Sequence, residues 1–200
     1  MAPRLHRLAA LLVSCLVVMA AAQSAVARPN LPDCDGDPSI SIGSLGNGRL
    51  VNGVFFPAAG PDHSAWNFRA QRNGGSDRTR WGHCRVVRAV LPGLAAYRDR
   101  NPDAPPVAVG DMALRHGSEI DGHSTHENGR QIDICLPRRD GKFREPHTVA
   151  QVDPRLTCEL VRALLNAGTD QILIGPNIRI GTPTRAIPWP NLDDRLRAMF

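Results

Sequence analysis

The sequence predicts an α+β domain. Two segments carry apolar residues at helical spacing, Arg85–Arg98 and a longer pattern that follows Asp153. Three others have the composition of strands and are bounded by glycine or proline: Val107–Leu114, Arg130–Leu136 and Gln171–Ile174. Strands on both sides of one long helix are typical of the α+β class.

The N-terminal part of the domain is predicted to begin with a β-hairpin. Residues Ser39–Phe56 alternate in polarity and break at Gly46-Asn47-Gly48 and at Asn52-Gly53, as short strands joined by tight turns do. The next segment, Pro57–Arg80, is polar and rich in Gly, Asn and Arg. We therefore expect it to be a surface loop.

The two helices differ in how clearly the sequence marks them. Within Arg85–Arg98, Pro92 lacks an amide donor and is expected to kink or restart the helix. The second helix has all its signals, because Asp153 can cap it, Pro154 suits its first turn and Gly168 marks its end.

Residues 1–27 are predicted to be a secretory signal and residues 28–200 the domain. After a basic start, an apolar run covers Leu8–Ala22, and Ala25-Val26-Ala27 forms a small-residue cleavage site. The run is short of the roughly 18 to 20 apolar residues that a membrane anchor needs, and no other stretch is long enough. We expect export to the periplasm, the cell wall or the extracellular space.

The charge of the chain excludes one class of partner. The formal net charge of +5 falls to +3 in the mature chain, because the signal carries Arg4 and Arg7 and no acidic residue. That excess is too small to indicate a nucleic-acid-binding protein. About 173 residues remain after cleavage, which is enough for one domain with its own core.

Four cysteines remain after the signal leaves with Cys15: Cys34, Cys84, Cys135 and Cys158. An even number in an exported chain predicts two disulfides, with three possible connectivities. No Cys-x-x-Cys spacing is present, so a structural zinc site made of thiolates is not expected.

The stretch from Asp121 to Ile134 carries the residues that indicate chemistry. His126 stands where a turn enters a predicted strand, and Asp133 lies between two isoleucines. A carboxylate in such a strand is costly to bury unless it is paired or binds a metal. A neutral imidazole and a carboxylate are normal zinc ligands, which leave positions for a third ligand and a water.

His126, Gly129 and Asp133 resemble the first zinc motif of the penicillin-insensitive murein endopeptidases, which belong with the lysostaphin-type and D-Ala-D-Ala metallopeptidases. Further segments resemble that family in the same order along the chain: Ser41-Ile42-Gly43-Ser44, Leu50-Val51-Asn52-Gly53-Val54, Trp81-Gly82, Thr148-Val149-Ala150-Gln151-Val152-Asp153 and Ile174-Gly175-Pro176. The resemblance implies a central, largely antiparallel sheet flanked by helices, like the hedgehog and D-Ala-D-Ala peptidase architecture. It also implies zinc-dependent hydrolysis of murein peptide cross-links such as the D-alanyl-diaminopimelyl bond, with peptidoglycan peptide stems as partners.

The chain departs from this pattern near its C-terminus. The family completes its zinc site with a segment resembling Asn-His-Asp-Asp-His-Leu-His, where this chain has Asn191-Leu192-Asp193-Asp194-Arg195-Leu196-Arg197. The resemblance therefore keeps His126 and Asp133 as metal ligands but puts Arg197 at the third-ligand position and Arg195 at the catalytic histidine position. A guanidinium stays protonated in a protein and offers no lone pair to a metal.

Two residues are candidates to complete the zinc site in place of Arg197. The first is His123, where the family often has a pocket histidine and which is also a candidate catalytic residue. The second is Cys135, which is expected on the same strand face as Asp133. His83, His116 and His147 are expected to be packing or surface residues.

Without a metal, other assignments stay open. Arg197 would form a bidentate ion pair with Asp133, or His126 and Asp133 would persist as a hydrogen-bonded pair. Arg195 would either contact acidic groups of a peptide stem or remain solvated. The alternative function is therefore a catalytically inactive family member that binds cell-wall peptide without zinc chemistry.

Overall fold

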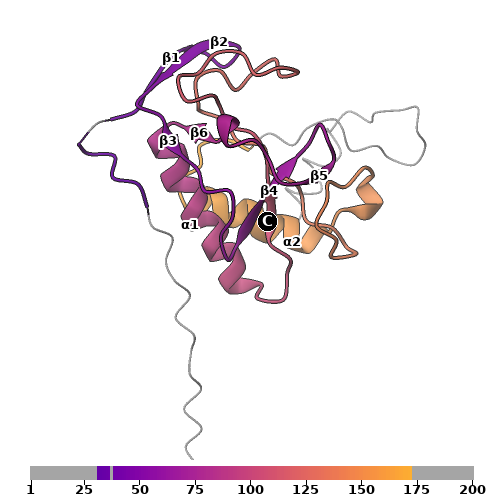
Figure 1. The fold of residues 1–200 in the computed structure, drawn as a ribbon. Coiled ribbons are helices and arrows are strands. Elements are labelled where there is room, and N and C mark those ends of the chain that lie inside the picture. The colour runs from indigo at the N-terminus through magenta and orange to yellow at the C-terminus, as the bar shows by residue number, and fades with distance from the viewer. Residues whose placement is uncertain (1–30, 37, 173–200) are drawn as a thin grey trace, which may run out of the picture.

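The structure of the protein is a computed structural model, and it describes residues 31–36 and 38–172 (Figure 1). The predicted signal, Arg195, Arg197 and the rest of the C-terminal segment lie outside these residues. The elements follow in the order β1 (Ile40–Ser44), β2 (Asn47–Val51), β3 (Val54–Phe55), β4 (His63–Asn67), β5 (Arg72–Asn73), η1 (Asp77–Thr79), β6 (Trp81–Gly82), α1 (Cys84–Arg100), β7 (Val107–Val109), η2 (Val149–Gln151) and α2 (Pro154–Asn166).

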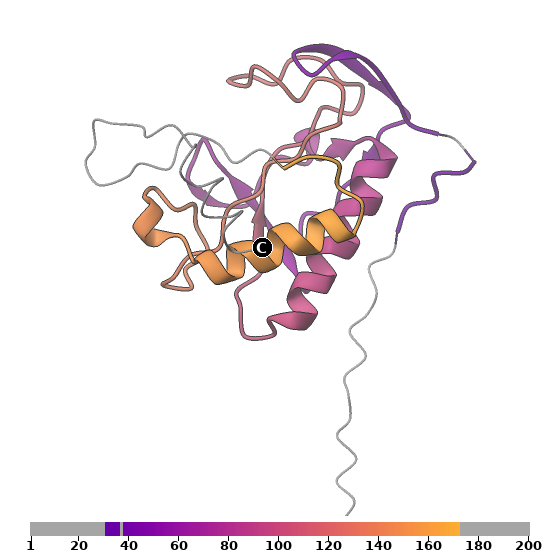
Figure 2. The ribbon, with the colours of Figure 1, turned by 180° about the vertical axis from the view of Figure 1, so that it is seen from behind.

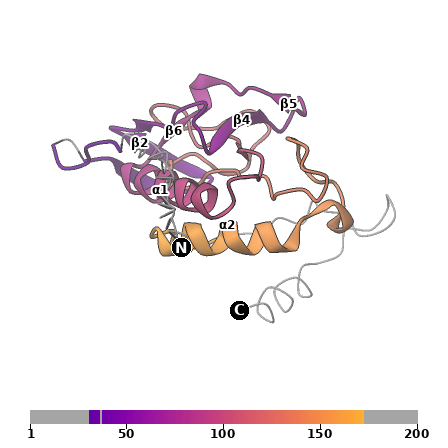
Figure 3. The same cartoon turned by 90° about the horizontal axis from the view of Figure 1, so that it is seen from below.

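The α+β class is confirmed. The described strands form three small sheets, with the orders β1-β2, β3-β6 and β5-β4-β7. Every strand pair is antiparallel except β4 with β7, which is parallel. Figure 3 shows these strands on one side and the two helices on the other. The largely antiparallel pairing was therefore predicted correctly, although the described strands do not join into one sheet.

The predicted N-terminal hairpin is confirmed. Strands β1 and β2 pair from Ile40 with Val51 to Ser44 with Asn47, so the turn is Leu45-Gly46. Only one apolar side chain of the hairpin is deeply buried, that of Leu50, which is 1% exposed. The hairpin is thus attached to the domain through one face and leaves the other to solvent.

The prediction that Pro57–Arg80 is a surface loop was wrong. This segment contains β4, the central strand of the three-stranded sheet, and Trp66 on β4 is 4% exposed. The polar residue His63 made the strand hard to recognise from the sequence. Its burial is compensated by a short contact of 2.5 Å between its Nδ1 and Asp62. A buried polar side chain with its own partner gives a sequence pattern that looks like a loop.

Helix α1 is confirmed and extends beyond its predicted bounds. It runs through Pro92 without restarting. The carbonyl that loses its helical partner belongs to Arg88, which is exposed, so water can satisfy it. The N-cap of the helix is His83, whose side chain accepts a hydrogen bond from the backbone amide of Arg85.

Helix α2 has the predicted beginning and end. Asp153 accepts a hydrogen bond from the amide of Leu156, Pro154 opens the first turn, and Gly168 follows the helix with a φ of +98°. Figures 1 and 2 show α2 crossing α1 from opposite viewpoints. Their facing sides form the main core, whose buried side chains include those of Val87, Val90, Leu91, Leu94, Leu156, Leu160, Ala163 and Leu164.

The strands predicted around the motif are shorter than expected. In Val107–Leu114 only β7 is a strand, and in Arg130–Leu136 only Ile134 forms a bridge, to Val109. Residues 171–172 are irregular, and the rest of the third predicted strand lies outside the described residues. Three backbone hydrogen bonds nevertheless tie residues 108–111 to 133–135.

Among the described residues one disulfide is present, where two were predicted. It joins Cys34 to Cys84 and so ties the segment before the hairpin to the start of α1. Cys135 is a free thiol in the interior, so the second disulfide is not formed. Burial raises the pKa of the Cys135 thiol. Its neighbours, Trp66 and Ala108, are also buried.

No helix within residues 31–36 and 38–172 has the length and apolar character needed to cross a membrane.

The α1–α2 core should dominate stability. Leu94 is 0% exposed, so Leu94→Ala should lower the free energy of unfolding by about 2–5 kcal/mol in urea titrations. The control Leu165→Ala alters a leucine of α2 that is 46% exposed. It should change the free energy of unfolding by about 0.5 kcal/mol or less. Equal losses for both variants would contradict this account of the core.

Thiol labelling should distinguish Cys135 from the bonded pair. Because Cys135 is buried and its thiol pKa is raised, it should resist iodoacetamide in the native protein and react after unfolding without reductant. A non-reducing digest should link the Cys34 and Cys84 peptides. Recovery of a peptide that links Cys135 to any other cysteine would overturn this assignment.

Candidate metal centre

His126 has a strained backbone conformation. Its φ is +79°, which is uncommon for a residue with a side chain and costs on the order of 1–3 kcal/mol. Gln131 accepts a hydrogen bond from the His126 amide at 3.2 Å. The ring is buried, with 5% of the residue exposed, and its Nδ1 lies 2.8 Å from the carbonyl oxygen of Met112.

The carbonyl of Met112 decides which nitrogen of His126 is available. A carbonyl only accepts hydrogen bonds, so Nδ1 carries a proton and donates it. The other nitrogen, Nε2, lies 3.2 Å from Oδ1 of Asp133. A neutral imidazole would set its Nε2 lone pair against the carboxylate, so a proton or a metal ion is needed between them.

Asp133 is fixed by backbone pairing rather than by burial. Its amide donates to the carbonyl of Asp111 at 3.0 Å, and its own carbonyl accepts from the amide of Gly110 at 2.8 Å. Its side chain is 35% exposed, so the expected buried carboxylate is in fact open to solvent on one side. That opening allows a ligand to reach the group.

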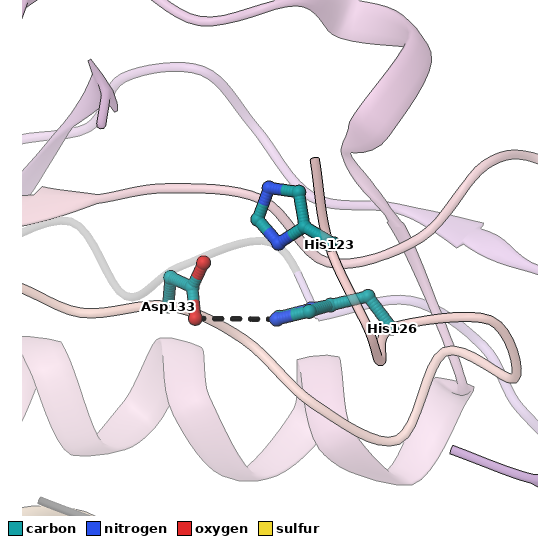
Figure 4. A group of neighbouring side chains, drawn as sticks. All are labelled: His123, His126 and Asp133. Atoms are coloured by element: carbon teal, nitrogen blue, oxygen red, sulfur yellow. Dashed lines mark ion pairs between the residues drawn. The ribbon is translucent and has the colours of Figure 1, made fainter. Parts of the chain in front are cut away.

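His123 completes the cluster. Its ring centre lies 5.0 Å from that of His126, nearly perpendicular to it at 81°. Its Nε2 lies 3.3 Å from Oδ2 of Asp111. Figure 4 shows one ring nitrogen of His123 directed toward His126 and Asp133 and the other directed away.

The geometry of the three side chains is compatible with a zinc ion. One ligand atom each of His123, His126 and Asp133 lies within 4.8 Å of the others. Tetrahedral zinc with bonds near 2.0–2.2 Å separates its ligand atoms by about 3.3–3.6 Å. The separation of 3.2 Å between His126 Nε2 and Asp133 Oδ1 is close to that value, and a ring nitrogen of His123 lies within 4.8 Å of both.

The electrostatics favour a cation at this place. Burial opposes protonation of His126, but the hydrogen bond and charge of Asp133, with smaller effects from Met112 and Asp111, outweigh it and raise the pKa of His126. The same negative potential that favours a proton on Nε2 favours a metal ion there.

Sequence reasoning missed Asp111 and Thr79. Asp111 stands two residues after β7 and faces His123, and the hydroxyl of Thr79 contacts its other carboxylate oxygen. The sequence feature that could have indicated Asp111 is an aspartate just beyond a short apolar strand, where the chain emerges from the core. It could not show which histidine the carboxylate would meet.

An apolar side chain also borders the cluster. A Cβ added at Gly110 would lie 2.3 Å from Cε2 of Phe68 and 3.1 Å from Cβ of Asp133. Gly110 therefore allows the Phe68 ring to lie close to Asp133, where it can form an apolar wall.

Other predicted site residues are not brought to the cluster. Cys135 packs with Trp66 and Ala108 and is not in the group with Asp133, so it is not the replacement ligand. His83 caps α1, and His116 and His147 are exposed, as expected for packing and surface residues.

Comparison with protein families places the chain in a known family. A sequence-family model described as penicillin-insensitive murein endopeptidase matches residues 41–167, which include the hairpin except Ile40, both helices and the cluster. No curated protein matches the chain.

The interaction between His126 and Asp133 can be tested in chelator-treated protein. Asp133→Asn removes the negative charge that raises the pKa of His126 and leaves a weaker, neutral acceptor, so burial should then dominate and the pKa should fall. NMR titration of the His126 ring protons measures this change. Asp99→Asn, at an exposed position on α1, should leave the pKa unchanged. An unchanged His126 pKa in Asp133→Asn would contradict the proposed contact.

Proposed function

Because the chain belongs to the penicillin-insensitive murein endopeptidase family, we propose that it hydrolyses peptide cross-links in murein with a zinc ion held by His126, Asp133 and His123. The expected substrate is the D-alanyl-diaminopimelyl bond. The observation that carries the proposal is the Met112 carbonyl, because it leaves His126 Nε2 facing Asp133 and ready to bind a cation.

The residues of the cluster have distinct roles in this proposal. Met112 keeps His126 in the tautomer that exposes Nε2 to the centre. Asp111, whose Oδ2 lies 3.3 Å from Nε2 of His123, would orient the ring so that the other ring nitrogen is directed to the same centre. A zinc ion at this centre would supply Lewis acidity toward an amide carbonyl.

The exposure of the cluster supports access by a peptide. The side chains of His123 and Asp111 are each 23% exposed and that of Asp133 is 35% exposed, whereas that of His126 is only 6% exposed. A substrate would therefore approach from the side of His123 and Asp133. His126 would bind the metal from the protein interior.

His123 as the third ligand would compensate for the C-terminal departure. In the sequence, Arg195 and Arg197 stand at the two positions where the resemblance implies a catalytic histidine and a ligand. The proximity of His123 to His126 and Asp133 supports a ligand set made within one segment of the chain. The family and the disulfide Cys34–Cys84 together support action in the cell wall, outside the cytoplasmic membrane.

Zinc analysis and hydrolysis test the proposal together. The purified protein should contain close to one zinc per chain and cleave cross-linked muropeptide dimers, with both properties lost in His126→Ala and Asp133→Ala. His123→Ala should also lose zinc. Asp111→Asn should weaken zinc binding about 10- to 100-fold, because it removes the group that orients a ligand. His147→Ala, at an exposed position outside the cluster, is the control.

A second candidate function is favoured by Arg195 and Arg197. In this alternative the chain binds cell-wall peptide without zinc chemistry, and Arg197 pairs with Asp133. Absence of zinc from the purified protein, with zinc and hydrolysis appearing only in the Arg195→His, Arg197→His variant, would establish this alternative and refute the first.

A further inference from the structure

The outward face of the hairpin is apolar and exposed. Ile40 and Ile42 alternate with inward residues of β1, and Val51 lies opposite Ile40 on β2. These three side chains are 50%, 42% and 39% exposed, in that order. On the inward face, Leu50 is buried and the hydroxyl of Ser41 donates to the carbonyl of Asn128.

An open groove of about 700 Å³ begins on this hairpin, a volume in the range of ligand sites. It lies between β2 and the loop at Arg115 and His116, and its lining residues are Ile42, Arg49, Leu50, Val51, Asn52, Gly53, Arg115 and His116. The backbone holds the two walls together, because the amide of Leu50 donates to the carbonyl of His116 at 3.1 Å.

The groove is positively charged. Arg49 and Arg115 line it, and no acidic side chain does so among the described residues. Within the described part of the chain, neither guanidinium forms an ion pair or donates a hydrogen bond. Arg115 is held in place by stacking, with its Cζ 5.1 Å from the ring centre of Trp81. Two guanidinium groups are thus available to bind carboxylates in a bidentate way.

We propose that this groove binds the peptide stem of murein, with Arg49 and Arg115 on its carboxylates and Ile42 and Val51 on its alanine methyl groups. The proposal rests on the proposed function, because it assumes that murein is what this protein meets. The mixture of two cations with exposed aliphatic side chains matches a stem, which alternates carboxylates with methyl groups. A polyanion without apolar groups would leave the aliphatic side chains without contacts.

Hydrogen bonds of Glu127 join the hairpin that carries the groove to the segment that carries the metal centre. The amide of Glu127 donates to the carbonyl of Leu45, and a Glu127 carboxylate oxygen accepts from the amide of Gly48 at 2.9 Å. The hairpin is therefore fastened to the residue that follows His126. A stem held in the groove would be bound to the same rigid unit that carries the candidate zinc ligands.

Calorimetric titration of the full chain with an uncross-linked stem peptide tests the groove, because that peptide contains no cross-link to cleave. Arg49→Gln, Arg115→Gln should bind at least tenfold more weakly than the unmodified protein. Arg88→Gln, Arg100→Gln removes the same charge from exposed positions of α1 and should change the affinity less than twofold. Equal affinity of the groove variant and the unmodified protein would overturn the proposal.

A stem peptide with amidated carboxylates identifies the chemistry recognised. The unmodified protein should bind it at least tenfold more weakly than the natural stem, and the groove variant should lose nothing further. Amidation without effect would refute carboxylate recognition. If loss of the Arg115–Trp81 stack unfolds the double variant, the single variant Arg49→Gln tests the groove instead. It should bind the stem at least threefold more weakly than the unmodified protein, and unchanged binding would refute the groove.

Zinc content of the same samples separates this proposal from the proposed function. The groove variant should hold as much zinc as the unmodified protein, because no groove residue belongs to the metal cluster. If the unmodified protein contains no zinc and the groove variant loses stem binding, the zinc enzyme is refuted and the groove is supported. Zinc-containing, active protein whose stem binding is unaffected by the groove variant would refute the groove alone.

Discussion

The chemistry of the candidate centre depends on one hydrogen bond, from Nδ1 of His126 to the carbonyl of Met112. Met112 is fully buried, and its amide is fixed by the carbonyl of Thr79 at 2.7 Å, so the acceptor cannot follow the ring if it turns. The bond sets the tautomer of His126 and directs its second nitrogen at Asp133. A different acceptor geometry would leave the same residues without a common centre.

Two kinds of packing hold this geometry. The backbone pairing of residues 108–111 with 133–135 fixes Asp133 and Asp111 relative to β7. The neighbouring side chains of Ile132 and Ile134 pack against the α1–α2 core. On the other side, the hairpin is bound to the segment after His126 through Glu127. The centre therefore lies between a rigid core and a hairpin whose outer face remains available for binding.

As proposed, catalysis and wall recognition would use different parts of this chain. The family model matches the segments that carry the hairpin and the cluster, and in the proposed function Arg195 and Arg197 bear on the cluster alone. Recognition of a stem by Arg49 and Arg115 does not need a metal. Selection can therefore change the chemistry of the centre without removing affinity for the wall, which explains how a family member could retain the scaffold under either function.

The sequence by itself determined the features that local interactions specify. Asp153 and Pro154 fixed the start of α2, alternation fixed the hairpin, and the residue types of His126 and Asp133 indicated a metal centre. Only the tertiary structure decided the partners of residues far apart in the chain: β4 with β7, Asp111 with His123, and Cys34 with Cys84. Caps and turns are encoded within a few residues, whereas these contacts depend on how the whole chain packs.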